Sequence, residues 1–341
     1  MATRGRYAPT PSGLIHVGNA RTALVAWLAV RSVGGTFVWR LEDLDPPRTV
    51  PGAAEAAIDD LRWLGLDWDE GPDVGGPYGP YVQSERSDRY DDALRRLAQD
   101  GRLFPCRHSR KDLKALAVAP HGGGHGPRVS PYPAHLRPDP GTLSKGWIED
   151  HLGPSNADDA SLRFRVDGEP VRVEDRFLGQ QTERVDQAVG DFVLRRRDGL
   201  YAYQLAVVVD DLAMEIDDVV RGVDLMESTA RQVQLIRALG GTVPNYGHVP
   251  LVLNAEGEKL SKRDGGLTLR SLRERGVAPE ALVGYLAFSL GLRGRPTPAK
   301  PRDLLADFRW DRLRREDWTL PADLASALVE GSPLAGYPAL T

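Results

Sequence analysis

The fold of this chain is decided by the stretch Arg6-Tyr-Ala-Pro-Thr-Pro-Ser-Gly-Leu-Ile-His-Val-Gly-Asn-Ala-Arg21. Its first residues are typical of the end of a strand. Pro9, Pro11 and Gly13 then predict an irregular turn, because proline fixes φ and removes a backbone donor, whereas glycine tolerates a positive φ. Apolar residues at helical spacing follow, and Gly34-Gly35 predicts the end of that helix. The stretch therefore predicts a strand, a turn and a helix.

His16, Gly18 and Asn19 lie at the expected start of this helix, where the amides and the helix dipole attract an anion. An ordinary junction in an α/β protein has the same appearance. A second stretch, Lys259-Leu-Ser-Lys262-Arg263, follows the apolar run 249–253 and on its own is typical of a solvated loop. The two stretches are informative because they occur together and in this order.

Composition excludes several classes of protein. The chain has 341 residues, of which 41% are hydrophobic and 27% charged, as in a soluble globular protein of two or three domains. No apolar run approaches the roughly 20 residues that span a bilayer, so we expect a cytoplasmic protein without a membrane partner. The single cysteine, Cys106, excludes an intrachain disulfide framework. A net charge of −4 argues against a protein that coats nucleic acid, but it permits a local basic surface.

The pattern Pro-x-Pro-Ser-Gly-x-x-His-x-Gly-Asn and the lysine stretch together resemble the two signature motifs of class I aminoacyl-tRNA synthetases, known as HIGH and KMSKS. Their wording resembles the glutamyl branch of that class. The resemblance implies an α/β fold with a Rossmann-like parallel sheet, an inserted α+β acceptor-binding subdomain and a C-terminal helical stem-contact region. It also implies that the protein uses ATP with Mg²⁺ and that L-glutamate is its substrate.

The same resemblance assigns the site residues. The catalytic set would be His16, Gly18, Asn19, Lys259 and Lys262, and ATP would contact Thr10, His16, Gly18 and Lys262. Glutamate would contact Arg6, Ala8, Thr10, Glu42, Tyr203 and Arg221. A carboxylate at Glu42 suits an ammonium group. Two guanidinium groups and a phenol suit a side-chain carboxylate, and they would reject glutamine because its amide offers donors to donors.

Further elements follow from hydrophobic spacing and from glycine or proline at the ends. We expect a strand over 36–40 and helices over 51–64, 84–99, 227–239, 267–275 and 279–292, with a short helix over 301–308. The apolar run 205–209, followed by Asp210-Asp211, predicts a fully buried strand of a parallel sheet. Residues 118–140 are rich in Pro, Gly and His and predict a mobile loop.

The change of pattern along the chain predicts four parts. Residues 1–102 and 191–250 would form the two halves of the Rossmann-like catalytic domain. Residues 103–190 would form the inserted acceptor-binding subdomain, and 251–341 would carry the lysine loop, the helical stem-contact region and a tail.

Cys106, His108 and Tyr132 resemble part of a zinc site found in short relatives of the family. The last ligand position of that pattern holds Leu136, which does not bind metal, although His135 is adjacent. We interpret the motif as a degenerate site without zinc, because ligand geometry rarely survives a shift of one residue.

The resemblance ends near residue 320, and the remaining residues are too few for an anticodon-binding domain. That pattern, with the phrase Val219-Val-Arg-Gly-Val-Asp-Leu-Met-Glu-Ser-Thr229, resembles the truncated family of glutamyl-queuosine tRNA(Asp) synthetases. Family members activate glutamate without tRNA and attach it to queuosine at the wobble position of the tRNA(Asp) anticodon stem-loop. We expect a monomer.

Three alternatives stay open at this point. The protein could charge the 3′ end of a tRNA, transfer glutamate to an acceptor other than RNA, or bind RNA without catalysis. Intact His16 and lysine motifs argue against the last alternative, because a binding module needs neither.

Overall fold

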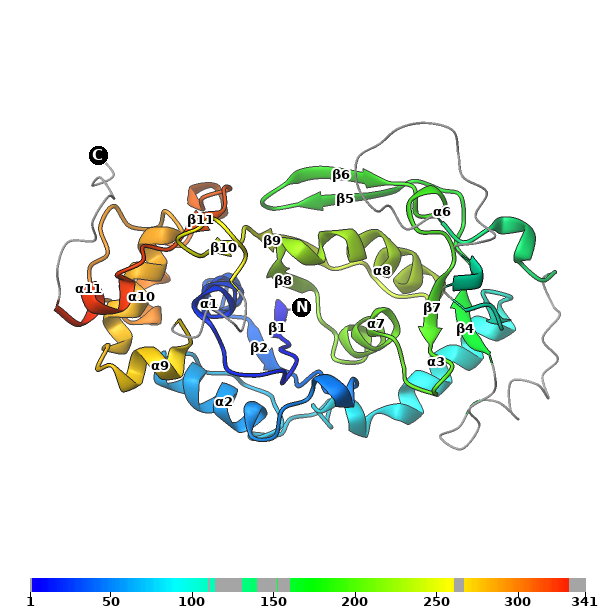
Figure 1. Cartoon of the computed structure of the whole chain (residues 1–341), viewed down its shortest axis with the longest axis horizontal. Helices are drawn as coiled ribbons and strands as arrows, with labels where there is room; N and C mark the ends of the chain where they lie inside the picture. The colour runs from blue at the N-terminus through cyan, green and yellow to red at the C-terminus, as the bar shows by residue number, and fades with distance from the viewer. Residues whose placement is uncertain are drawn as a thin grey trace.

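The computed structural model describes residues 2–109, 111–113, 131–139, 152, 160–260 and 267–330. The molecule is elongated, with a parallel sheet near its middle (Figure 1). A group of C-terminal helices lies at one end, and a small second sheet lies at the other.

The main sheet has six strands in the order β2-β1-β8-β9-β5-β6. These strands are β1 (Arg4–Tyr7), β2 (Thr36–Trp39), β5 (Val171–Asp175), β6 (Gly179–Glu183), β8 (Asp218–Gly222) and β9 (Asn245–Val249). The first five in the order pair in parallel, and β6 is antiparallel to β5. The chain leaves β1 toward β2 and later returns to its other side with β8. Such a reversal opens a crevice at the carboxyl ends of the strands.

Helices cover both faces of this sheet. One apolar core contains α1 (Val17–Arg31), α2 (Ala53–Trp63) and α10 (Pro279–Ser289), and a second contains α3 (Ser87–Gln99), α7 (Tyr203–Ala213) and α8 (Met226–Ala238). Neighbouring strand residues enter different cores, as Phe37 and Val38 of β2 do. This arrangement explains why the strands lack an apolar and polar alternation. Gly5 lets α1 approach β1, because a Cβ there would clash with Val30.

The small sheet is antiparallel, in the order β3-β4-β7, with β3 (Leu103–Cys106), β4 (Ser161–Phe164) and β7 (Phe192–Arg195). The short helix α6 (Val185–Ala188) precedes β7. The pairing of the strands does not follow the boundary that was predicted at residue 190. The strands β5 and β6 lie before it but extend the main sheet, whereas β7 lies after it but completes the small sheet. The four-part division stays a prediction.

The C-terminal part packs beside α1. It contains β10 (Val252–Leu253), which pairs in parallel with β11 (Trp318–Thr319), and the helices α9 (Leu269–Glu274), α10 and α11 (Leu324–Glu330). The buried side chain of Arg21 links these elements, because its guanidinium donates to the carbonyls of Pro250 and Ser289. Burial and the nearby Arg314 lower the pKa of Arg21 to about 10.

Short 3₁₀ segments connect the larger elements. They are η1 (Pro46–Arg48), η2 (Gln83–Glu85), η3 (Ala134–Leu136), η4 (Val223–Leu225), η5 (Pro301–Leu304) and η6 (Trp310–Arg312). The strand expected over 36–40 and the helices expected at 51–64, 84–99, 227–239, 267–275 and 279–292 are confirmed within a few residues. The short helix expected over 301–308 is limited to η5.

One predicted element is wrong. Residues 205–209 belong to the helix α7 and not to a strand of the parallel sheet. All residues from Gln204 to Asp211 are buried, because α7 packs against α3, α8 and the strand β7 of the small sheet. A helix enclosed on all sides has no polar face, and a short apolar run does not distinguish it from a buried strand. The pair Asp210-Asp211 therefore lies inside the core and not at the end of a strand.

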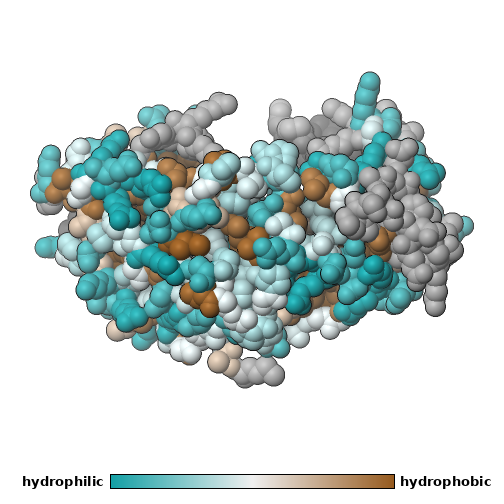
Figure 2. All heavy atoms as spheres, turned by 90° about the horizontal axis from the view of Figure 1, so that it is seen from below, coloured by the Kyte–Doolittle hydropathy of each residue, from teal (hydrophilic) through white to brown (hydrophobic). Residues whose placement is uncertain are grey.

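The surface seen from below mixes hydrophilic and hydrophobic residues without one continuous apolar area (Figure 2). Among the described residues, no helix has both the length and the apolar character needed to cross a membrane.

Candidate active site

A cleft of about 1610 Å³ lies at the carboxyl ends of β1, β8 and β9. Its walls include the turn after β1, the start of α1, the end of β8 with η4, and the segment that follows β9. It continues to residues of the small sheet, among them Arg163 and Val193. The site therefore occupies the crevice that the strand order creates.

Every sequence-predicted site residue that the structure describes, metal ligands aside, lines this cleft. The set comprises Arg6, Ala8, Thr10, His16, Gly18, Asn19, Glu42, Tyr203, Arg221 and Lys259. Lys262 lies outside the described residues. The fold thus brings together residues that are up to 253 positions apart in the chain, from Arg6 to Lys259.

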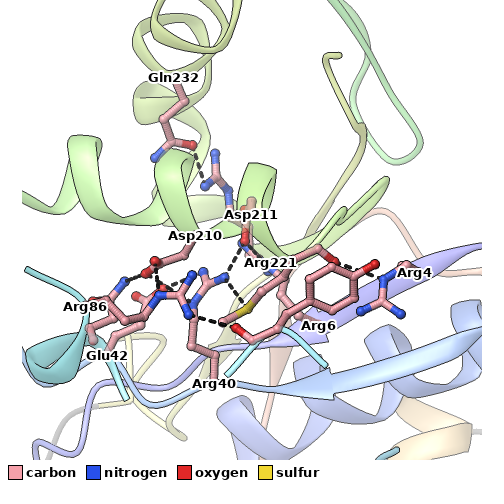
Figure 3. Close-up of polar contacts among 12 residues, drawn as sticks. Arg4, Arg6, Arg40, Glu42, Arg86, Asp210, Asp211, Arg221 and Gln232 are labelled. Atoms are coloured by element: carbon pink, nitrogen blue, oxygen red, sulfur yellow. Dashed lines mark hydrogen bonds and ion pairs between the residues drawn. The ribbon is translucent and has the colours of Figure 1, made fainter. Parts of the chain in front are cut away.

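Asp211 of α7 anchors two arginines below the cleft (Figure 3). Its Oδ1 atom accepts from Arg40 Nη1 at 2.7 Å and from Arg6 Nε at 3.3 Å. Burial opposes ionisation of this carboxyl, but the positive charges of Arg6 and Arg40 outweigh burial and lower its pKa. The Arg40 side chain is fully buried. Its three carboxylate neighbours, Asp211, Glu42 and Asp210, keep its pKa raised against the desolvation that burial imposes.

Asp210, the neighbour of Asp211, turns to a different set of partners. It accepts from Arg86 Nε at 2.6 Å, from Gln83 Nε2 at 2.7 Å and from Tyr90 Oη at 3.0 Å. Figure 3 shows the contact between Arg86 and Asp210, and both side chains are fully buried. A buried carboxylate with three donors is the arrangement that offsets the cost of desolvation. Two consecutive aspartates therefore tie α7 to the strand β2 and to α3.

Glu42 follows β2 and faces the cleft from this network. Its Oε1 atom accepts from Arg40 Nη2 at 3.0 Å, and its side chain is only 8% exposed. Burial raises the pKa of Glu42, and Arg40 and Arg6 only partly offset this effect. A bound ammonium group would add a further positive neighbour and favour the carboxylate form.

Arg221 of β8 is held on three sides. Its Nε donates to His248 Nε2 at 3.0 Å and its Nη2 to Thr229 Oγ1 at 2.8 Å. Its Nη1 donates to Gln232 Oε1 at 2.7 Å (Figure 3). Nη1 also lies 3.4 Å from the hydroxyl of Tyr203. Each nitrogen of the guanidinium therefore already has an acceptor.

Arg6 differs from Arg221 in the donors that it leaves for a ligand. Its Nε and Nη1 donate to Asp211 and to the carbonyl of Val220. Among the described residues, the hydrogen bonds of Arg6 use only these two nitrogens and leave Nη2 without an acceptor, and Arg6 lines the cleft. The two arginines thus reach the same cleft, but Arg6 offers it more N–H groups.

His16 is the N-cap of α1. Its Nδ1 accepts from the backbone amide of Asn19 at 3.2 Å, so a neutral ring carries its proton on Nε2. The amide of Val17 donates to Leu267 O at 3.0 Å. We expected several amides at the start of α1 to hold an anion. This expectation needs correction, because the amides of Val17 and Asn19 already donate to acceptors within the chain. The amide of Gly18, which has no acceptor among the described residues, stays available to a ligand.

Gly18 also keeps the His16 ring in place. A Cβ at Gly18 would lie 3.1 Å from the ring atoms of His16 and 3.4 Å from Val252. A side chain at this position would press on the His16 ring, which would have to shift by a few tenths of an ångström.

Lys259 reaches across the cleft to η4. Its Nζ donates to Asp224 Oδ2 at 2.6 Å, and the side chains of this ion pair are 55% and 41% exposed. Exposed pairs of this kind contribute little to stability and exchange partners readily. The ammonium group of Lys259 is therefore held at the cleft by a pair that a bound anion could replace.

The residues of the suspected metal site do not form one donor cluster. The Tyr132 hydroxyl lies 3.6 Å from Cys106 Sγ, within a small apolar group that includes Phe104. His108 lines the main cleft, and His135 lies in η3. Burial, together with the neighbouring Cys106, raises the pKa of Tyr132. Within the described parts of the chain, no group of three or more His, Cys, Asp or Glu residues could hold a metal ion.

Several residues that hold the side chains of the cleft in place were not predicted as site residues from the sequence. They are Arg40, Arg86, Asp175, Asp210, Asp211, Gln232 and His248. The sequence held a weak signal for these residues. A charged residue inside an apolar stretch is rarely buried without a partner, so its position indicates a buried ion pair or hydrogen bond. The placement of 205–209 in a strand concealed that signal for the two aspartates.

Comparison with known proteins places this fold and cleft in a class. A sequence model of the family described as tRNA synthetases class I (E and Q), catalytic domain, matches residues 2–305. The chain belongs to this family, and the fold expected from the resemblance is confirmed.

The more particular relationship comes from individual relatives. The chain is 49% identical over 329 residues to the glutamyl-Q tRNA(Asp) synthetase of Symbiobacterium thermophilum, covering 96% of this chain and 99% of that protein. It is 44% identical to the protein of the same name from Nitratidesulfovibrio vulgaris, with the same coverage. Glutamate–tRNA ligase 1 of Halorhodospira halophila is 42% identical over 290 residues, which cover 58% of that ligase. The resemblance to the glutamyl-queuosine family is thereby confirmed.

A solved structure agrees with this relationship. The crystal structure of a glutamate tRNA ligase from Elizabethkingia meningosepticum, in complex with its amino acid, superposes with a TM-score of 0.80 at 28% identity. The superposition covers 96% of this chain and 69% of that one.

Proposed function

We propose that this protein activates L-glutamate with ATP in the absence of tRNA and then transfers the glutamyl group to queuosine in the anticodon of tRNA(Asp). The observation that carries the proposal is the combination of near-full-length relatives of that name with a cleft containing the motif residues. The roles of individual residues below belong to the same proposal.

The glutamate subsite lies where Arg6, Arg221 and Tyr203 meet. Arg6 supplies the larger share of N–H donors to the side-chain carboxylate, and Arg221 and the Tyr203 hydroxyl complete its environment. Glu42 accepts from the ammonium group, and Ala8 and Thr10 line the path between the two ends of the substrate. This arrangement selects glutamate over glutamine, because a glutamine amide would direct N–H donors toward guanidinium donors.

The nucleotide subsite lies at the start of α1. The Nε2–H of His16 and the amide of Gly18 bind phosphate oxygens, and Thr10 and Asn19 line the same end of the cleft. Lys259 and Lys262 close over the pyrophosphate. Mg²⁺ would bind through the phosphate oxygens of ATP and neutralise part of their charge.

Activation needs no general base, because the α-carboxylate of glutamate is already a nucleophile at pH 7. A carboxylate oxygen attacks the α-phosphorus, a bond to that phosphorus forms, and the bond to the β-phosphate oxygen breaks with release of pyrophosphate. The protein contributes position and fixed charges. A hydroxyl of the acceptor then attacks the glutamyl carbonyl, AMP leaves with the bonding electrons, and the hydroxyl proton is lost to solvent or to AMP.

The acceptor is tested by direct transfer. Radiolabelled glutamate, ATP and the purified protein are incubated with tRNA(Asp) that carries queuosine and with the same tRNA that carries guanosine at the wobble position. We expect label only in the first RNA, and this label should persist when the 3′-terminal adenosine is removed.

Each alternative predicts a different location of the label. Loss of label with the terminal adenosine would indicate charging of the 3′ end. Label in a ribonuclease-resistant fraction would indicate an acceptor other than RNA. Absence of glutamate activation altogether would leave a non-catalytic RNA-binding paralogue.

A further inference from the structure

A buried chain of three side chains lies directly behind the proposed glutamate subsite. Asp175 ends β5, His248 lies in β9, and Arg221 lies opposite His248 in the β8–β9 register. His248 Nδ1 is 2.6 Å from Asp175 Oδ2, and His248 Nε2 is 3.0 Å from Arg221 Nε. Arg221 lines the cleft, whereas His248 and Asp175 do not. The side chains of His248 and Asp175 are fully buried.

The geometry determines the tautomer of His248. An arginine Nε carries a hydrogen at every accessible pH and only donates, so the Nε2 atom of His248 must accept. The single proton of the neutral ring then lies on Nδ1 and points to the carboxylate of Asp175. Thr229, from α8, is the remaining polar contact of Nε2, at 3.1 Å.

The surrounding charges keep the ring neutral. Burial lowers the pKa of His248, and the positive charges of Arg221 on β8 and Arg6 on β1 act in the same direction, while Asp175 on β5 opposes them. On its own strand, the ring of Tyr246 stacks beside it at 5.9 Å. Asp175 stays ionised, because hydrogen bonds from His248 and from two backbone amides outweigh its burial and lower its pKa.

The other contacts of Arg221 are also fixed by partners that do not reach the substrate carboxylate. Gln232 presents its oxygen to Arg221 (Figure 3), because its amide nitrogen donates to Gln204 Oε1 at 2.9 Å. Gln204 in turn donates to Ser228 at 2.9 Å. These hydrogen bonds fix Gln232 as an acceptor. His248, at the Nε atom of Arg221, is different, because a ring nitrogen can change from acceptor to donor when it takes up a proton.

We propose that Asp175 and His248 are positioning residues for the glutamate subsite, which hold Arg221 through one histidine tautomer and release it when the ring takes up a second proton. This inference rests on the proposed function. A protonated ring would direct an N–H at the Nε–H of Arg221 and place two positive charges together. The affinity for glutamate should then fall in acid, while the affinity for ATP should not.

Asp175→Asn tests the tautomer directly. The backbone amides of Phe177 and Leu178 donate to Asp175 Oδ1 at 2.9 and 3.0 Å, whereas Oδ2 accepts from the backbone amide of His248, at 3.2 Å. The oxygen of an asparagine should therefore stay with the two shorter contacts. Its NH₂ group then faces His248 Nδ1 and forces the ring proton onto Nε2, against Arg221. We expect the KM for glutamate in ATP–pyrophosphate exchange to rise about tenfold, the scale of one lost hydrogen bond to a charged group, with the KM for ATP unchanged.

His248→Gln and His248→Leu provide the rescue comparison. Glutamine offers an oxygen to Arg221 and an NH₂ group to Asp175, whereas leucine offers neither. We expect His248→Gln to raise the KM for glutamate by less than about threefold and His248→Leu by about tenfold. Because the pKa of His248 is lowered from the ordinary histidine value of about 6.5, the KM of the parent for glutamate should stay constant around that pH and increase only in stronger acid. His248→Gln should remove that increase.

Asp191→Asn is the matched control. It also removes a buried carboxylate, which pairs with Arg137 at 2.6 Å, but Asp191 does not line the cleft. It should leave both KM values unchanged. If Asp175→Asn fails to fold, the His248 pair and the pH profile still decide.

The positioning role is refuted if His248→Leu and Asp175→Asn change the KM values for glutamate and ATP equally, or if both variants fold and change neither. A parent protein without glutamate-dependent exchange would instead refute the proposed function, so the two failures are distinguishable.

Discussion

The two ends of the cleft are built in opposite ways. At the proposed glutamate end, Arg40, Arg6 and Arg221 have exposures of 0%, 4% and 5%, and most of their partners lie in strands and helices. At the phosphate end, Lys259 and Asp224 are 55% and 41% exposed and lie in a loop and a short 3₁₀ segment. Buried pairs hold one geometry, whereas exposed pairs exchange partners at little cost. The difference suggests that amino-acid selection depends on fixed charges, and pyrophosphate release on charges that move.

The substitution Arg6→Ala should have the largest effect, and it tests whether one end of the cleft serves glutamate alone. Loss of the guanidinium that offers the most donors to the cleft should lower kcat/KM for glutamate roughly a thousandfold and leave the KM for ATP within about twofold. Steady-state ATP–pyrophosphate exchange measures both. Arg6→Lys should recover little, because an ammonium does not reproduce the planar fork. Equal losses for glutamate and ATP would contradict a dedicated glutamate end.

The two ends of the cleft should also differ in how much their ion pairs contribute to the free energy of unfolding. Asp211→Ala removes the carboxylate shared by Arg6 and Arg40 and leaves buried positive charges, so it should lower the free energy of unfolding by about 3 kcal/mol. Asp224→Ala breaks the exposed pair with Lys259 and should cost less than about 1 kcal/mol. Urea denaturation of both variants checks the contrast. Similar losses would mean that burial does not distinguish the ends.

Lys262→Ala examines the phosphate end. The prediction rests on the motif, because Lys262 lies outside the described residues. Activation should fall about a hundredfold, the scale of one preorganised charge contact, with no change in melting temperature. Lys259→Ala should act in the same direction. Exchange at the parental rate by Lys262→Ala would show that this lysine loop has no part in activation.

The smallest expected effect is a pH dependence of stability. The pKa of His248 is lowered in the folded protein, so below about pH 6.5 the unfolded chain binds a proton that the folded chain does not. The free energy of unfolding should therefore decrease as pH falls through this window, by at most about 1.4 kcal/mol per pH unit. Denaturation at pH 7 and pH 5.5 measures the slope, which His248→Gln should reduce. An unchanged slope would show that His248 is not the titrating group.

Sequence patterns predicted the residues that line the cleft better than they predicted the buried residues that hold those side chains in place. His16, Gly18 and Glu42 were assigned from motifs, and the structure places all three in one cleft, because His16 and Gly18 begin α1 and Glu42 follows β2. Asp210 and Asp211 were assigned to the end of a strand, because five apolar residues before them have no periodicity that reveals a helix. Ion pairs between residues more than 100 positions apart, such as Arg86 with Asp210, depend on the tertiary fold and leave no local pattern.

The part of the cleft near the small sheet shows the same limit. His108 was grouped with Cys106 because the two resemble a zinc motif of short relatives, yet His108 lines the cleft and Cys106 faces an apolar cluster. Spacing along a strand end does not determine which side each residue faces.

The central claim is that the buried charges form the glutamate end without help from RNA. Glutamate-dependent ATP–pyrophosphate exchange, measured on the purified protein with and without added tRNA, tests it most directly. The account predicts exchange at a similar rate in both conditions. Exchange only when tRNA is added would contradict it, because the glutamate end would then depend on the nucleic acid for its geometry.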